Sequence, residues 1–100
     1  MNIDIIEIDG KEYELCLNRK AIKIAENAGL TPDAFEKRPL SAIDALWRAS
    51  FIIKHPEVTE EKASELYDLA EAKDSELLGN IIKKLVDKYV SFFKALSNIQ

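Results

Sequence analysis

The residue types that most often perform catalysis or bind metals are scarce in this sequence. His55 is its one histidine and Cys16 its one cysteine, and neither has a nucleophile or base beside it. A Cys–His pair or a zinc site requires several such side chains at matching spacing. Cys16, between Leu15 and Leu17, has the neighbours of a packed strand residue. We therefore expect structural roles for both side chains, no catalytic residue and no enzymatic activity.

A group of glutamates is the nearest approach to a metal site. Glu57, Glu60, Glu61 and Glu65 lie close together but lack the alternating ligand spacing and the turn glycine of a calcium loop. A solvated helix face is the simpler interpretation. The three glycines of the chain stand far apart, so they form no phosphate-binding loop. We expect no metal and no cofactor.

The charge distribution argues against nucleic acid as a partner. The chain has 18 acidic and 14 basic residues and a net charge of -4, without a continuous basic stripe. A helix-turn-helix around His55 and Pro56 would place Glu60, Glu61 and Glu65 where a recognition helix faces phosphates. Protein partners are therefore favoured over nucleic acid.

The sequence predicts neither export nor membrane insertion. The N-terminal stretch MNIDIIEIDG lacks the positive charge and the small-residue cleavage site of a signal peptide. Lysines interrupt the most apolar stretch, IIKKLVDKYVSFFKAL at residues 81–96, which falls short of the roughly 20 apolar residues that span a bilayer. A single cysteine permits no internal disulfide, which suits a reducing compartment. We expect a soluble cytoplasmic protein that makes no use of a membrane.

A β-hairpin should occupy residues 1–17. Residues 3–8 and 11–17 are rich in strand formers, and the Asp9-Gly10 pair between them is a strong signal for a two-residue turn. Two strands alone are marginally stable, so helices should cover one face of the hairpin. The core face should carry Tyr13, Leu15 and Leu17, and the opposite face Glu12, Glu14 and Cys16.

Residues 18–100 should form the helical part of the same single domain, residues 1–100. We expect helices near residues 18–28, 41–54, 59–73 and 75–97, and a short connecting helix starting at Thr31 and Pro32. Helix starts are predicted from the side chains that precede them, which are Asn18, Ser41 and Thr59. The helix over 41–54 is apolar almost all round, so it should lie centrally, with Trp47 in the core. The fold class is α+β, a hairpin packed on a bundle of about four helices.

The last helix carries more apolar surface than one-sided packing needs. Its apolar arc spans roughly 140°, against the roughly 100° that faces a core in an ordinary surface helix. The excess predicts either self-association or a protein partner, although a small core that wraps the helix on two sides would also explain it. The candidate partner-binding residues are Leu85, Tyr89, Phe92, Phe93 and Leu96.

The order of these pieces resembles a known family. A hairpin runs directly into a helix in DGKEYELCLNRKAIKIAENAGL, and the apolar helix ALWRASFIIKHPEVTEE with its tryptophan follows. Over residues 8–72 this pattern resembles the small tail assembly chaperones of long-tailed bacteriophages and prophages. The resemblance implies a non-enzymatic protein of the bacterial host cytoplasm that coats the tape-measure protein and recruits tail-tube subunits. The client would bind the apolar helical surface, and homo-oligomers are expected.

Two other classes stay open. The first is a small acidic immunity protein or antitoxin that blocks a basic partner, and it should concentrate its acidic residues on one face. Residues 57–76 are the only such stretch, although Lys62 and Lys73 interrupt it. A structural domain that merely dimerises is the third possibility.

Overall fold

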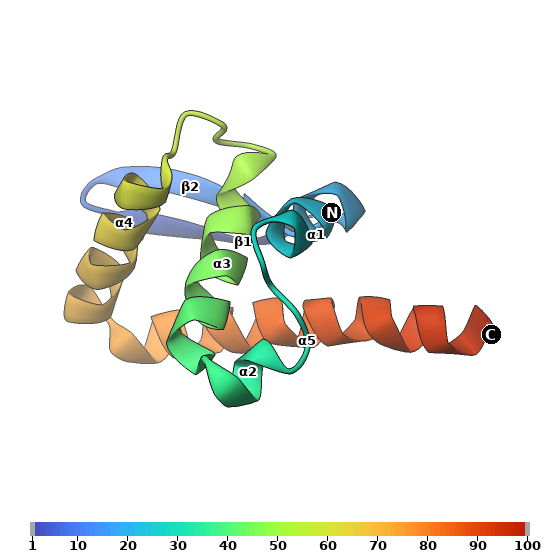
Figure 1. The fold of residues 1–100 in the computed structure, drawn as a ribbon. Coiled ribbons are helices and arrows are strands. Elements are labelled where there is room, and N and C mark those ends of the chain that lie inside the picture. The colour runs from blue at the N-terminus through green and yellow to red at the C-terminus, as the bar shows by residue number, and fades with distance from the viewer. Residues whose placement is uncertain (1, 100) are drawn as a thin grey trace.

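The structure is a computed structural model that describes the backbone of residues 2–99 and the side chains of residues 5–94. Its fold is α+β, as the sequence predicts: a two-stranded antiparallel hairpin followed by five helices, one of them very short (Figure 1). No helix in this described part has the length and hydrophobicity needed to cross a membrane.

The hairpin pairs β1 (Asn2–Ile8) with β2 (Lys11–Cys16). Asp9 has φ 53° and Gly10 has φ 81°, so both turn residues are left-handed, which is the backbone of a type I′ turn. Tyr13, Leu15 and Leu17 are buried, as predicted. Cys16, which alternation places on the face opposite Tyr13 and Leu15, is also buried, at 3% exposed.

Two helix starts show how local chemistry sets the boundaries. Helix α1 (Arg19–Asn27) begins after Asn18, whose side-chain oxygen accepts the Ala21 N–H at 2.9 Å. Helix α4 (Glu60–Lys73) begins after Thr59, whose hydroxyl accepts the Lys62 N–H at 3.1 Å. Both caps are those that the sequence predicts.

Two predicted starts are wrong. The short helix α2 (Ala34–Lys37) starts after Asp33. Thr31 does not cap it, because the Thr31 hydroxyl donates a hydrogen bond to the Asp33 carboxylate at 2.6 Å. Helix α3 (Pro39–Ile52) starts at Pro39 rather than Ser41. A proline suits the first helical position because its missing N–H would have no intrahelical partner there.

Helix α3 lies at the centre of the molecule, as predicted, in contact with α1, α2, α4, β2 and α5 (Ser75–Ile99). Trp47 is 1% exposed, and its indole N–H donates to the Ala63 carbonyl of α4 at 2.9 Å. Its ring meets Phe51 and Tyr67 edge to face, with centroids 5.0 and 5.6 Å apart. One buried cluster therefore joins the hairpin to every helix.

Candidate protein-binding surface

Two of the predicted partner-binding residues belong to the core. Leu85 is 0% and Tyr89 1% exposed, because α3, α4 and β1 pack against α5. The ring of Tyr89 also lies 5.5 Å from that of Phe35 on α2. Neither side chain offers surface to a partner in this structure. The excess of the apolar arc is thus explained in part by a core that wraps the helix.

Two further predicted residues keep part of their surface. Phe92 and Phe93 are half-buried, with the Phe93 ring 4.9 Å from Tyr89 and the Lys88 ammonium 5.5 Å above the Phe92 ring. The side chain of Leu96 lies outside the described residues. Figure 1 shows the C-terminal end of α5 extending beyond the other elements. Fewer elements are available there to cover an apolar side chain.

Sequence reasoning missed Val90, which is 42% exposed. It follows Ile82 and Val86 at intervals of four, so the three form a stripe along α5 beside the buried one. That spacing is a usable signal in the sequence. We call the partly exposed apolar residues in this part of α5 the α5 tip, defined by Val86, Val90, Phe92 and Phe93. Val90 and Phe92 are two residues apart and therefore lie on different sides of the helix.

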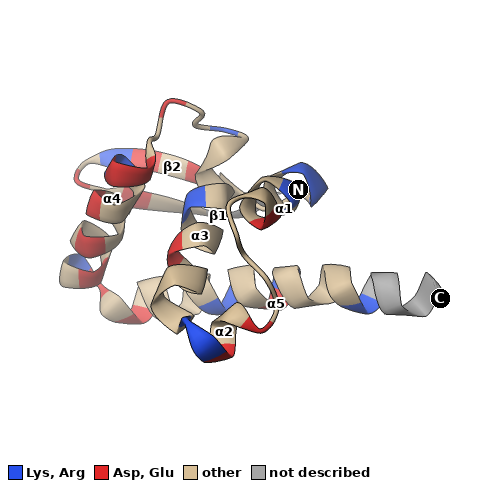
Figure 2. Cartoon of the chain, in the orientation of Figure 1, with Lys and Arg blue, Asp and Glu red and all other residues tan. Residues whose placement is uncertain are grey.

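Basic residues surround the α5 tip. Between residues 77 and 94 the helix has four lysines and one acidic residue, Asp87. Helix α4 has the opposite charge, as Figure 2 shows, with half of its exposed side chains acidic and only two of them basic. The molecule therefore presents one basic apolar end and one acidic face.

A second feature lies where α1, α3 and α4 meet. An open cavity of about 260 Å³ is lined by Ile24, Ala25, Ala28, Ser41, Asp44, Ala45, Trp47, Arg48, Ala49, Ile52, Glu60, Ala63 and Ser64. We call it the alanine cavity. It exists because five alanines stand where three helices face one another, and their side chains are too short to fill the space.

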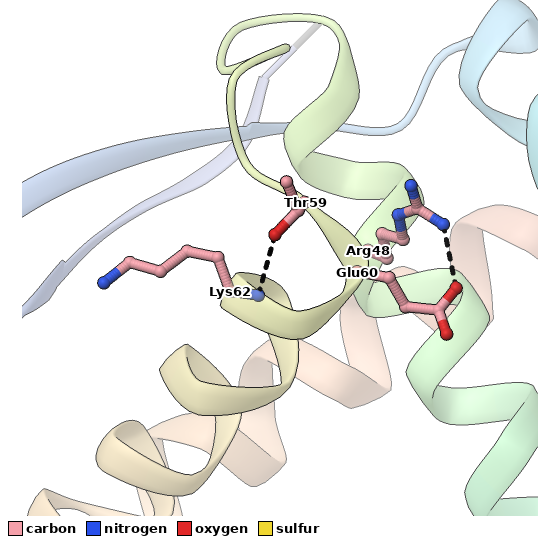
Figure 3. A network of polar contacts seen from close by, with 4 residues as sticks. All are labelled: Arg48, Thr59, Glu60 and Lys62. Atoms are coloured by element: carbon pink, nitrogen blue, oxygen red, sulfur yellow. Dashed lines mark hydrogen bonds and ion pairs between the residues drawn. The ribbon is translucent and has the colours of Figure 1, made fainter.

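Charged groups stand at the rim of the alanine cavity. The Arg48 guanidinium and the Glu60 carboxylate pair at 3.1 Å, next to the Thr59 cap of α4 (Figure 3). Burial raises the pKa of the Asp44 carboxyl, and the negative charges of Asp68 and Glu60 raise it further. Three carboxylates therefore share this side of the molecule, with one arginine among them.

His55 has a structural task. Its Nε2 accepts the Glu14 N–H at 2.9 Å, and its ring lies 5.2 Å from that of Tyr13. The imidazole thus ties the end of α3 to β2. Cys16 is buried as a free thiol. In the described part of the chain no group of three His, Cys, Asp or Glu side chains is placed to hold a metal ion.

Comparison with known proteins gives a family and no relative of known function. No curated protein and no solved structure matches the chain. A family model matches residues 1–98, almost the whole sequence, and its description is "Domain of unknown function (DUF5055)". On this match, the chain with the hairpin, the central α3 and the extended α5 belongs to the DUF5055 family.

Proposed function

We propose that this protein is a non-enzymatic tail assembly chaperone of a long-tailed bacteriophage or prophage. It binds the tape-measure protein and helps to recruit tail-tube subunits in the cytoplasm of the bacterial host. The proposal is supported by the resemblance of residues 8–72 to such chaperones. The observation that carries it is the α5 tip, an apolar surface on a helix that extends past the folded body (Figure 1).

The α5 tip suits a helical client for physical reasons. A chaperone of this kind must cover apolar helical surface, and a protruding helix can lie along a client without steric interference from the rest of the fold. Val90 and the half-buried phenylalanines supply apolar contact. Lys88 and Lys94 beside them favour clients with acidic residues next to the apolar ones.

An acidic inhibitor is the second candidate, and the exposed face of α4 favours it. Glu61, Glu65, Asp68 and Glu71 are all exposed on this helix. Such a face would steer a basic partner by long-range attraction. The two candidates therefore use different surfaces, which allows one pair of variants to separate them.

The test is capture of a co-expressed tape-measure fragment by wild type and by Phe92→Ser/Phe93→Ser. Burying a phenylalanine side chain against a client contributes roughly 1.5 to 3 kcal/mol, so the double variant should weaken capture by at least about tenfold. Thermal melts should show that it still folds. Val90→Ser is a milder second variant, since Val90 has the least buried side chain of the tip.

Leu40→Ser is the matched control, because Leu40 is 77% exposed and belongs to α3 rather than α5. It should capture the fragment as wild type does. Wild type that captures no tape-measure fragment would overturn the proposal. Binding to a basic protein that is abolished by Glu65→Lys/Asp68→Lys, but not by changes in the α5 tip, would support the acidic inhibitor instead.

A further inference from the structure

The alanine cavity has the size and lining of a socket for one large side chain. Its volume of about 260 Å³ lies below the roughly 300 to 1,000 Å³ of sites for small molecules. Its floor is apolar, with alanines from all three helices and the buried Trp47. An aromatic ring placed there would contact side chains on several sides.

The rim of the cavity selects a positive charge next to that ring. Asp44 and Glu60 line the cavity, and Asp68 is close enough for its charge to act on the Asp44 carboxyl. Arg48 offsets only part of this charge, because it supplies one positive charge among three carboxylates. The complementary occupant is an apolar side chain followed by a lysine or arginine.

The chain itself carries such an occupant at the α5 tip. Phe92, Phe93 and Lys94 are consecutive, and each keeps exposed surface on the helix that extends past the body. The alanine cavity of the same copy is formed by α1, α3 and α4, and no residue of α5 lines it. Ring and socket therefore lie on different parts of the molecule.

We propose that the alanine cavity of one copy receives the α5 tip of a second copy, with a phenylalanine ring inside and Lys94 at the acidic rim. The contact is heterologous, since each copy offers its helix end to one neighbour and its cavity to another. Repetition gives a ring or an open chain. The proposal goes beyond client binding and rests on the proposed function only in using the same α5 tip.

Competition between the two uses of the tip is a direct consequence. A tip held in a neighbour's cavity cannot lie along a client. Without a client, the α5 tips would be buried in the cavities of neighbouring copies. A client that binds a tip would release that subunit from the oligomer. Capture of the tape-measure fragment should therefore shorten the oligomer.

The test is sedimentation velocity over a concentration series. Wild type should associate, and Ser64→Phe should weaken association by at least about tenfold because the new ring fills the cavity from an exposed position on α4. Leu40→Ser is again the matched control, since the exposed Leu40 follows Lys37 and Arg38 in the sequence and does not line the cavity. It should associate like wild type.

A charge exchange tests the pairing itself. Asp44→Lys and Lys94→Asp should each weaken association several-fold, and a mixture of the two variants should recover part of it, because each supplies the other's missing partner. Failure of the mixture to recover, wild type that stays monomeric, or loss of association in Leu40→Ser would each overturn the proposal. A thermal melt of every variant shows whether it folds. If Ser64→Phe fails to fold, Ser64→Leu takes its place.

The same variants keep the two proposals separate. Ser64→Phe should still capture the tape-measure fragment, because its α5 tip is intact and free. If association follows the expected pattern but no variant captures the fragment, the chaperone function fails and the cavity contact stands. If Ser64→Phe loses the fragment and keeps association, the cavity binds the client and the proposed self-contact is wrong.

Discussion

At the scale of single residues, Trp47 is the side chain on which most of the core depends. It joins α3 to α4 through the hydrogen bond to Ala63 and to the hairpin side of the core through Phe51, whose ring meets that of Tyr13 at 5.5 Å. Its loss would remove packing and leave a large void.

Trp47→Ala should therefore destabilise the fold by about 3 to 5 kcal/mol, a large part of the stability of a typical domain. Trp47→Phe should cost less, because it keeps the aromatic contacts and loses the indole donor. Chemical denaturation followed by circular dichroism measures both. An alanine variant that unfolds at the wild-type denaturant concentration would show that the core does not depend on this ring.

Tyr89 is a second core residue, but its substitution should not destabilise the fold. Its hydroxyl is buried and has no hydrogen-bond partner among the described residues. A buried unpaired polar group costs free energy, so Tyr89→Phe should be neutral or stabilising by about 1 kcal/mol at neutral pH. Clear destabilisation in a denaturant titration would mean that the hydroxyl bonds to a buried water.

Alkaline pH should amplify this difference. Burial, and then the charges of Glu26 and Asp33, raise the pKa of Tyr89 above its ordinary value of 10.0. The unfolded chain therefore releases this proton first as the pH rises, and stability falls above about pH 10. Tyr89→Phe should lose less stability than wild type over that range. Equal losses in denaturant titrations at pH values on either side of 10 would contradict the assignment.

At the scale of elements, the three glycines occupy two kinds of position: two have positive φ, and one lies inside a helix. Gly10 has φ 81° in the hairpin turn and Gly29 has φ 105° after α1, whereas Gly79 lies within α5, with no atom within 4 Å of an added Cβ. One substitution should thus have opposite effects at different positions.

Gly10→Ala and Gly29→Ala should each destabilise the protein, by about 1 kcal/mol or more, because an alanine is strained at positive φ. Gly79→Ala should stabilise it by up to about 1 kcal/mol, the difference in helix propensity. Melting temperatures measured under one buffer condition compare all three. A stabilising Gly10→Ala would show that the turn adopts another conformation.

At the scale of the whole molecule, one core links the hairpin to all of the helices. Buried residues run from Ile6 in β1 to Tyr89 in α5 without a second cluster in the described chain. The radius of gyration over the Cα atoms is 13.1 Å, close to the roughly 13 Å of a compact 100-residue domain. The longest extent, 46 Å against 27 and 22 Å, reflects α5.

Unfolding should therefore be a single cooperative transition. Fluorescence of Trp47, the only tryptophan, reports on α3 and α4, and far-ultraviolet circular dichroism reports on all helices. The two should give the same midpoint and the same slope with denaturant. Separate midpoints would indicate that part of the chain unfolds independently, against the single domain expected for residues 1–100.

Local features of this fold could be predicted from the sequence because they depend on a few neighbouring residues. The Asp9-Gly10 turn and the Asn18 and Thr59 caps each follow from one side chain or one backbone preference. The central position of α3 followed from its nearly continuous apolar surface. These predictions are confirmed, as is the α+β class.

Only the tertiary structure decided what each apolar side chain faces. A helical wheel places Leu85, Tyr89 and Phe92 on one stripe, yet the first two are buried and the third is half-exposed, because neighbouring elements cover α5 along only part of its length. The alanine cavity depends on the meeting of three helices that are separate in sequence. Periodicity gives the direction of a side chain from its own helix axis, and packing between distant segments determines what lies there.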